Sequence, residues 1–161
     1  MNVWWKGLLA LSCMLFAKAS AAQADSQLQA GLAYRFVQFT EWNSPTAKTY
    51  CVAGDRGVFE ALQELVKLPD QVRAINNKRE AKNCNILFLG REQNSINQWQ
   101  SILDDPNILS IAASAELFNQ GAIFGLIIEP KQIAFRVNLS LARTRDYRLN
   151  SRMLKLAKEI H

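Results

Sequence analysis

Histidine is almost absent from this chain of 161 residues, because its one histidine is His161, the last residue. A serine or cysteine nucleophile needs a neighbouring general base, most often a histidine. His161 is poorly placed for that role at the chain end, so the sequence argues against a Ser-His or Cys-His enzyme. A single histidine also leaves the three cysteines without the partners of a zinc site, and we expect neither a metal nor a cofactor.

Other catalytic signatures are missing too. Asp104 and Asp105 are adjacent and precede Pro106, so turn formation explains them better than acid–base chemistry. The chain has no closely spaced Cys-x-x-Cys pair, which makes a thiol redox enzyme only a third candidate after the two functions given below. These absences favour a protein that is not an enzyme.

The chain also lacks an apolar run long enough to cross a bilayer. The apolar segment Gly7–Ala17 follows a lysine and precedes small residues with two Ala-x-Ala sites, which end at Ala21 and Ala24. This order is typical of a secretory signal peptide, and the alternative is an uncleaved membrane anchor. We therefore predict a signal peptide over residues 1–24, cleaved after Ala21 or Ala24, and a single domain over residues 25–161.

Removal of this segment lowers the number of Lys and Arg residues from 19 to 17, against 14 Asp and Glu, so the mature net charge is +3. The basic residues are scattered, apart from one cluster near the C-terminus. A nucleic-acid site needs a clustered phosphate-binding surface with aromatic partners, so we expect no nucleic acid. We interpret the cluster as a solvated face rather than an anion site; it comprises Arg143, Arg145, Arg148 and Arg152.

Export leaves two cysteines, Cys51 and Cys84, in an oxidising compartment. Two cysteines in such a compartment usually form a disulfide. The alternative is a pair of separate buried thiols. We predict the disulfide.

Apolar periodicity divides the mature chain into alternating helices and strands. The expected helices cover residues 26–42, 58–67, a segment with Ile96, Trp99, Ile102 and Leu103, residues 115–119, and a last helix from Asn150 or Ser151 with Met153, Leu154, Ala157 and Ile160 inward. The expected strands cover residues 49–53, 72–75, 85–90, 108–112, 121–128 and 133–139. This order predicts an α/β fold: a three-layer α/β/α sandwich with a mainly parallel sheet and a C-terminal antiparallel hairpin.

Two expected strands are each followed by glycine, at Gly54 and at Gly90. The carboxyl ends of parallel strands lie at one edge of a sheet, where α/β folds place ligand crevices. Asp55 and Gly57 follow Gly54, and the N-terminus of the next helix could face an anion there. A plain turn capped by Asp55 explains the same residues, since the full dinucleotide or P-loop pattern is missing. The possible ligand crevice therefore consists of Gly54, Asp55, Gly57 and Gly90.

Several segments, in this order, resemble the YfiR-like family of periplasmic proteins. The resemblance covers nearly the whole mature chain and lies in Ala30–Trp42, Tyr50–Asp55, Cys84 with Ile86–Leu89, Ile133–Leu139 and Leu149–Ala157. Cys51 and Cys84 match the family's long-range disulfide. Some members carry a second, closely spaced cysteine pair near the stretch that matches Phe118–Gly125, and this chain has none.

The resemblance implies a non-enzymatic periplasmic regulator. It implies repression of an inner-membrane diguanylate cyclase through the cyclase's periplasmic sensor domain, with lower cyclic di-GMP and less biofilm. It also implies two further partners, an outer-membrane peptidoglycan-binding lipoprotein and a second copy of the chain. The alternative from another class is a periplasmic protein that binds a small ligand in the crevice near Gly54 and Gly90.

Overall fold

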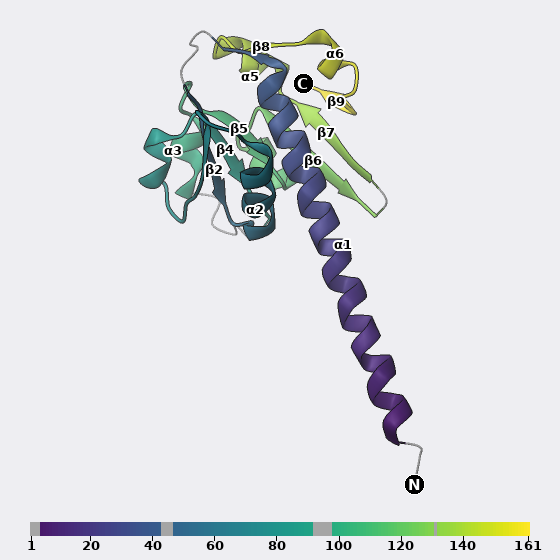
Figure 1. Cartoon of the computed structure of the whole chain (residues 1–161). Helices are drawn as coiled ribbons and strands as arrows, with labels where there is room; N and C mark the ends of the chain where they lie inside the picture. Colours follow the sequence, from purple (N-terminus) through teal and green to yellow (C-terminus); the bar gives the residue numbers. More distant parts are fainter. Residues whose placement is uncertain (1–3, 43–46, 92–97, 131) are drawn as a thin grey trace.

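The computed structural model describes residues 4–42, 47–91, 98–130 and 132–161, with side chains from residue 21 onward. Helices and strands alternate through most of this chain (Figure 1). The helical elements are α1 (Trp4–Gln38), α2 (Arg56–Leu65), the 3-10 turn η1 (Glu80–Asn83), α3 (Gln100–Leu103), α4 (Ala115–Asn119), α5 (Leu139–Thr144) and α6 (Ser151–Leu154). The strands are β1 (Thr40–Glu41), β2 (Thr49–Ala53), β3 (Gln71–Ala74), β4 (Ile86–Leu89), β5 (Leu109–Ala112), β6 (Phe124–Glu129), β7 (Gln132–Val137), β8 (Arg148–Leu149) and β9 (Glu159–Ile160).

Seven strands form the central sheet, in the order β3-β2-β4-β5-β6-β7-β9. The neighbours from β3 to β6 are parallel, and β6 and β7 form the antiparallel hairpin expected near the C-terminus. The predicted α/β fold with a mainly parallel sheet is therefore confirmed. The remaining strands, β1 and β8, form a separate antiparallel pair.

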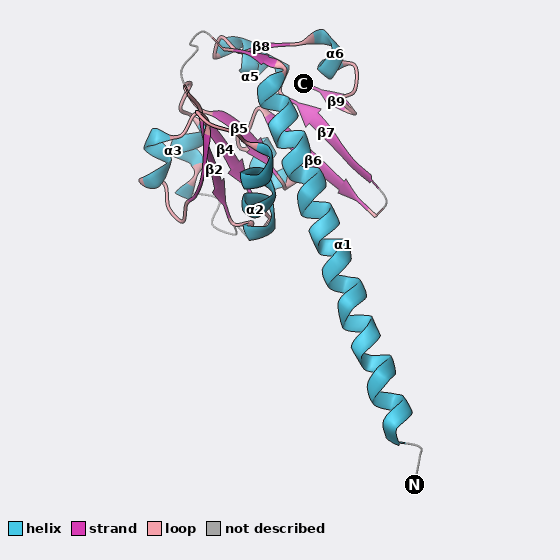
Figure 2. Cartoon of the chain, in the orientation of Figure 1, coloured by secondary structure: helices cyan, strands magenta, loops and turns pink. Residues whose placement is uncertain are grey.

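The inner strands β2, β4 and β5 are buried on both faces, and their successive side chains enter different cores. On β4, Ile86 and Phe88 lie in the core that α1 and α2 cover, whereas Leu87 and Leu89 lie in the core that α3 and α4 cover. In the first core Phe36 of α1 stacks on Phe124 of β6 with ring centroids 4.2 Å apart. Figure 2 shows the long α1 and the shorter α2 side by side along one face of the sheet. These two helical layers make the predicted three-layer sandwich.

The C-terminal segment differs from its prediction. The last helix, α6, ends at Leu154, and Ile160 lies in β9 instead of on a helical stripe. Two backbone bonds hold β9 beside β7, from the Lys158 N–H to the Phe135 carbonyl and from the His161 N–H to the Val137 carbonyl, each 2.8 Å. Pairing along the sheet edge outweighs another turn of helix because it satisfies groups of β7 that would otherwise stay open.

The helix predicted for residues 26–42 is also different at both ends. It ends at Gln38, because Thr40 and Glu41 pair with Leu149 and Arg148 as β1 and β8. At its other end it continues back to Trp4, through the segment interpreted as a signal peptide. Pro45 and the first part of the helix predicted around Ile96 lie outside the described residues.

One buried polar group in α1 lacks a partner. Gln29 is only 2% exposed, and no described group bonds to its Oε1 atom. Ser26 and Gln29 have the Ser-x-x-Gln spacing of a capping box, in which the glutamine side chain bonds to the backbone N–H of the serine. In a continuous helix the backbone N–H of the serine already donates to the carbonyl of the residue four positions earlier, so the glutamine cannot bond to it. The side chain is therefore suited to a helix that begins at Ser26.

The structure joins Cys51 of β2 to Cys84, which lies two residues before β4, with Cα atoms 5.8 Å apart. This separation lies within the usual range for a disulfide. Both cysteines are buried in the core beneath α3 and α4. The bond therefore fastens β2 to the segment that leads into its neighbour β4.

Replacement of both cysteines by serine should destabilise the domain by about 3–4 kcal/mol, because the unfolded chain regains the entropy that the closed loop removes. Urea unfolding of the Cys51→Ser/Cys84→Ser variant measures the loss, and reduced wild-type protein is the matched control. Mass spectrometry without reductant should find the wild-type protein two hydrogens lighter than its reduced form. Two thiols that alkylate freely in the native exported protein would contradict the prediction.

Candidate functional site

Gly54 and Gly90 lie together at one edge of the sheet, because β2 and β4 are parallel and Ala53 pairs with Leu89. The backbones of the two turns are in direct contact. The Gly90 N–H donates to the Ala53 carbonyl at 2.7 Å, and a Cβ atom on Gly90 would lie 2.3 Å from the Gly54 carbonyl oxygen. Backbone thus fills the space directly between the two turns.

Asp55 and Gly57 serve the start of α2. The Asp55 carboxylate accepts a hydrogen bond from the Val58 N–H at 2.9 Å and caps the helix, as the simpler of the two interpretations predicts. Gly57 faces α1, where a Cβ atom would lie 2.4 Å from the Ser26 hydroxyl. A carboxylate therefore already occupies the helix N-terminus, where an anionic ligand would bind.

Among the cavities formed by the described residues, the two that lie beside these positions divide the four predicted residues between them or leave them out. A cavity of about 600 Å³ opens beside Gly54, between α2 and the edge strand β3, and excludes Gly57 and Gly90. Its walls are Val52, Gly54, Asp55, Arg56, Phe59, Glu60, Gln63, Ala74, Ile75 and Asn76. A second hollow, of about 430 Å³, lies between α1 and α2 and includes Gly57. Sequence analysis missed the contribution of β3, because pairing of β3 with β2 brings Ala74 and Ile75 to this place and no local pattern indicates it.

Charged groups at the larger cavity are already engaged with each other. Arg56 and Glu60 form an ion pair of 2.8 Å one helical turn apart, and their hydrogen bond raises the pKa of Arg56 above its usual value. Asp55 is held by the cap. Phe59 and Ile75 supply apolar surface. The cavity could accept a small, mainly apolar molecule, because Arg56 and Glu60 are paired with each other and Asp55 is used in the helix cap.

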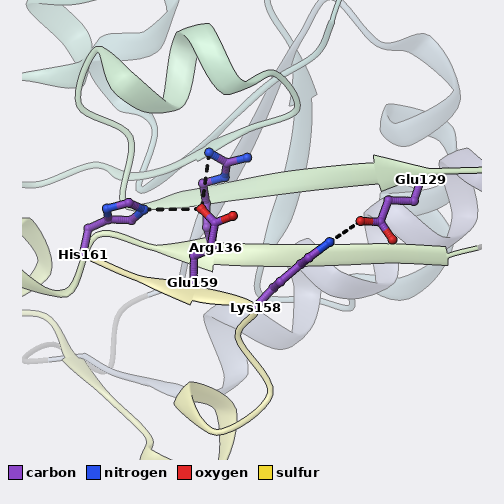
Figure 3. A network of polar contacts seen from close by, with 5 residues as sticks. All are labelled: Glu129, Arg136, Lys158, Glu159 and His161. Atoms are coloured by element: carbon purple, nitrogen blue, oxygen red, sulfur yellow. Dashed lines mark hydrogen bonds and ion pairs between the residues drawn. The ribbon is translucent and has the colours of Figure 1, made fainter.

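The histidine lies in a surface network of charged residues (Figure 3). Glu159 of β9 contacts His161 at 3.5 Å and Arg136 of β7 at 3.6 Å, while Lys158 bonds to Glu129 at the end of β6. The bond from Lys158 lowers the pKa of Glu129 below its usual value. The pairs Arg136–Glu159 and Lys158–Glu129 join the C-terminal segment to the hairpin, so these two contacts help to hold β9 in place. The network holds no serine, threonine or cysteine nucleophile.

Two tyrosines have perturbed pKa values for a structural reason. Burial raises the pKa of Tyr147 to about 12, and it raises the pKa of Tyr50 as well. Tyr147 packs edge-on against Trp42, with ring centroids 5.7 Å apart. Both are core residues, which explains the shifts without a catalytic role. Among the residues that the structure describes, no group of three or more His, Cys, Asp or Glu side chains could hold a metal ion.

A family model described as YfiR/HmsC-like matches residues 26–158. The chain belongs to the YfiR/HmsC-like family. Membership indicates a periplasmic regulator of diguanylate cyclase signalling rather than an enzyme. The disulfide agrees with an oxidising compartment. In the described segments no helix is both long and apolar enough to cross a membrane.

No curated protein matches this member of the family. One similar solved structure is described as the ABC domain in complex with L-Trp from Streptococcus pneumonia, with a TM-score of 0.59, 11% identity, and coverage of 82% of this chain and 60% of that chain. Another is a conserved domain protein from Vibrio cholerae O1 biovar El Tor, with a TM-score of 0.47, 12% identity, and coverage of 73% and 56%. This chain thus spans about 60% of the length of the first structure, whose likeness supports the α/β fold and nothing further.

Substitution of Gly90 by alanine tests the closed contact between the two turns. The added Cβ atom would clash with the Gly54 carbonyl, so Gly90→Ala should destabilise the protein by about 1–3 kcal/mol. Gly31→Ala is the matched control: no atom lies within 4 Å of its Cβ position, and alanine in a helix should stabilise by about 0.5–1 kcal/mol. Urea unfolding of both variants measures the difference, and a Gly90→Ala protein as stable as the wild type would show that the turns are not in contact.

Proposed function

We propose that this protein represses an inner-membrane diguanylate cyclase by binding the cyclase's periplasmic sensor domain, which lowers cyclic di-GMP and biofilm formation. The match to the YfiR/HmsC-like family over residues 26–158 carries this proposal, because it covers every helix and strand of the sandwich except β9. The site geometry agrees with a binding role, since the groups that the sequence offered for chemistry are used in caps, turns and ion pairs.

Repression by binding has a modest energetic requirement. A ligand shifts a two-state equilibrium only by the difference between its affinities for the two states. A tenfold shift of the cyclase toward its inactive state needs about 1.4 kcal/mol of differential binding, and a shift from 1:99 to 99:1 needs about 5.5 kcal/mol. Both lie within the range of an ordinary protein interface.

Two further partners belong to the same proposal. An outer-membrane lipoprotein that binds peptidoglycan would sequester the repressor and release the cyclase. A second copy of the chain would form a homodimer. Both rest only on the resemblance to this family.

Export is the remaining part of the proposal. The signal peptide would be removed after Ala21 or Ala24, which leaves Ser26 near the new N-terminus. Two observations support a helix that begins there: the family match starts at residue 26, and the unpartnered Gln29 side chain fits a capping box with Ser26. Residues 21–25 of α1 are exposed and add nothing to the core.

N-terminal sequencing of the periplasmic protein should begin at Ala22 or Asp25. Removal of the box in Gln29→Ala should destabilise the processed protein by about 0.5–2 kcal/mol, as for loss of other caps. Gln27→Ala, exposed on the same turn, is the control and should change stability little. A protein that retains Met1 after export would overturn the processing proposal.

Deletion of the gene should raise cellular cyclic di-GMP and biofilm, and removal of the partner cyclase as well should cancel the rise. Complementation with the wild-type gene or with Gly31→Ala should restore repression, whereas Cys51→Ser should fail because the domain is destabilised. Cyclic di-GMP measured in cell extracts gives the result.

An unchanged cyclic di-GMP level in the deletion strain, with the cyclase demonstrably expressed, would count decisively against repression.

The second candidate function is small-ligand binding, which the cavity of about 600 Å³ beside Gly54 favours. Thermal stabilisation of the purified protein by one of a panel of small metabolites would support this function. Co-purification with a membrane cyclase would support the first.

A further inference from the structure

Positive charge is concentrated at one end of the chain. Residues 139–161 contain six Lys and Arg and two acidic residues, Asp146 and Glu159, a net charge of +4. Residues 25–138 contain 11 Lys and Arg and 12 acidic residues, a net charge of −1. The mild overall charge of the proposed mature protein therefore hides a strong asymmetry.

The fold gathers this charge in space as well. The elements α5, β8 and α6 lie together at one end of the molecule, around the end of α1 that leads into β1 (Figure 1). The N-terminus of α1 extends away from the opposite end. Arg143 on α5, Arg148 on β8 and Arg152 on α6 are all exposed there. Charges that are separate in the sequence thus share one end of the protein.

Three exposed cations and one exposed apolar side chain at this end of the protein are here called the basic face: Arg148, Arg152, Lys155 and Leu156. Met153 is buried, so it fixes the inner side of the α6 turn. Lys155 is the C-cap residue of α6 and Leu156 follows it directly, so both lie close to Arg152 at the end of this short helix. Leu156 is 76% exposed.

The cations of the basic face are not neutralised within the described parts of the chain, where none of them forms an ion pair. Two acidic residues are near. Glu41 pairs with Arg148 across β1 and β8 without an ion pair, and Asp146 lies two residues before Arg148. Glu159 is engaged with Arg136. The face therefore keeps a net positive charge.

The chemistry of the basic face matches an anionic lipid surface. Cations that flank an exposed leucine are the pattern of an interfacial anchor, in which the apolar side chain enters the boundary region and the long basic side chains reach the headgroups. A fluid lipid surface accepts charges wherever they stand, and the two cavities described above are lined by residues outside this face. An acidic protein would need a matching shape, and the three short elements offer none of these cavities to it.

We propose that the basic face binds anionic phospholipid headgroups at a membrane surface, with Leu156 inserted among them. The protein would then associate with the periplasmic leaflet reversibly, through a few cations and one side chain. This activity is separate from repression of a cyclase, and it can be measured without any partner protein.

Sedimentation of the purified periplasmic protein with vesicles tests the proposal. Vesicles of equal parts phosphatidylglycerol and phosphatidylcholine should bind it, vesicles of phosphatidylcholine alone should not, and binding should weaken as salt shortens the range of the charges. Replacement of Arg148, Arg152 and Lys155 by glutamine should weaken binding about a hundredfold, at roughly fivefold for each cation. Leu156→Gln, which leaves the charge unchanged, should weaken it severalfold.

The matched control replaces Arg73, Lys78 and Arg79 by glutamine. These exposed cations lie on β3 and the loop after it, at the other edge of the sheet, and their loss changes the net charge equally. Circular dichroism and urea unfolding should show that both triple variants fold like the wild type. Equal loss of binding in both would overturn the proposal, because net charge alone would explain it. Absence of binding to phosphatidylglycerol, together with salt-dependent binding to an acidic protein, would also overturn it.

Discussion

Burial of the inner strands β2, β4 and β5 on both faces is the constraint on which the rest of the structure depends. A strand such as β4 carries large apolar side chains on both sides, so helices must cover each face. A slip of one residue in its pairing with β2 would exchange the two sets of side chains between cores of different shape. The disulfide opposes such a slip, since it ties β2 to the residues just before β4. The same pairing sets Gly54 against Gly90.

The sequence predicted those elements whose formation depends on their own residues. The strand at 49–53 and the short helix at 115–119 were predicted with the bounds that the structure has, because each has a continuous apolar or capped pattern of its own. The C-terminal region was predicted poorly. β8 and β9 have two residues each, too few for a period, and they exist because β1 and β7 offer open backbone groups from elsewhere in the chain.

The candidate site, too, was predictable in part: the position of its turns could be predicted, but the way they pack could not. Parallel pairing places the turns after β2 and β4 at one edge, and this much could be predicted from strand order. Whether those turns leave a gap depends on the side-chain volume between them, which is zero at Gly90 and allows the backbone to close. The observed cavity lies one strand further out, where β3 ends the sheet. The parallel arrangement of the strands could be predicted from the sequence, whereas the packing between turns that are distant in the sequence could not.

The C-terminal segment carries the basic face and also pairs with the residues that follow α1. Its strand β8 pairs with β1 directly after α1, and the Asn150 N–H bonds to the Phe39 carbonyl at 2.9 Å, so the basic face is attached to the end of the helix whose Phe36 lies in the core. Trp42 and Tyr147 pack on each other at the same junction. Backbone pairing and aromatic contact therefore attach the segment that carries the basic face to the end of α1. Binding at this face would have to preserve that junction, which restricts it to the outward side chains of β8 and α6.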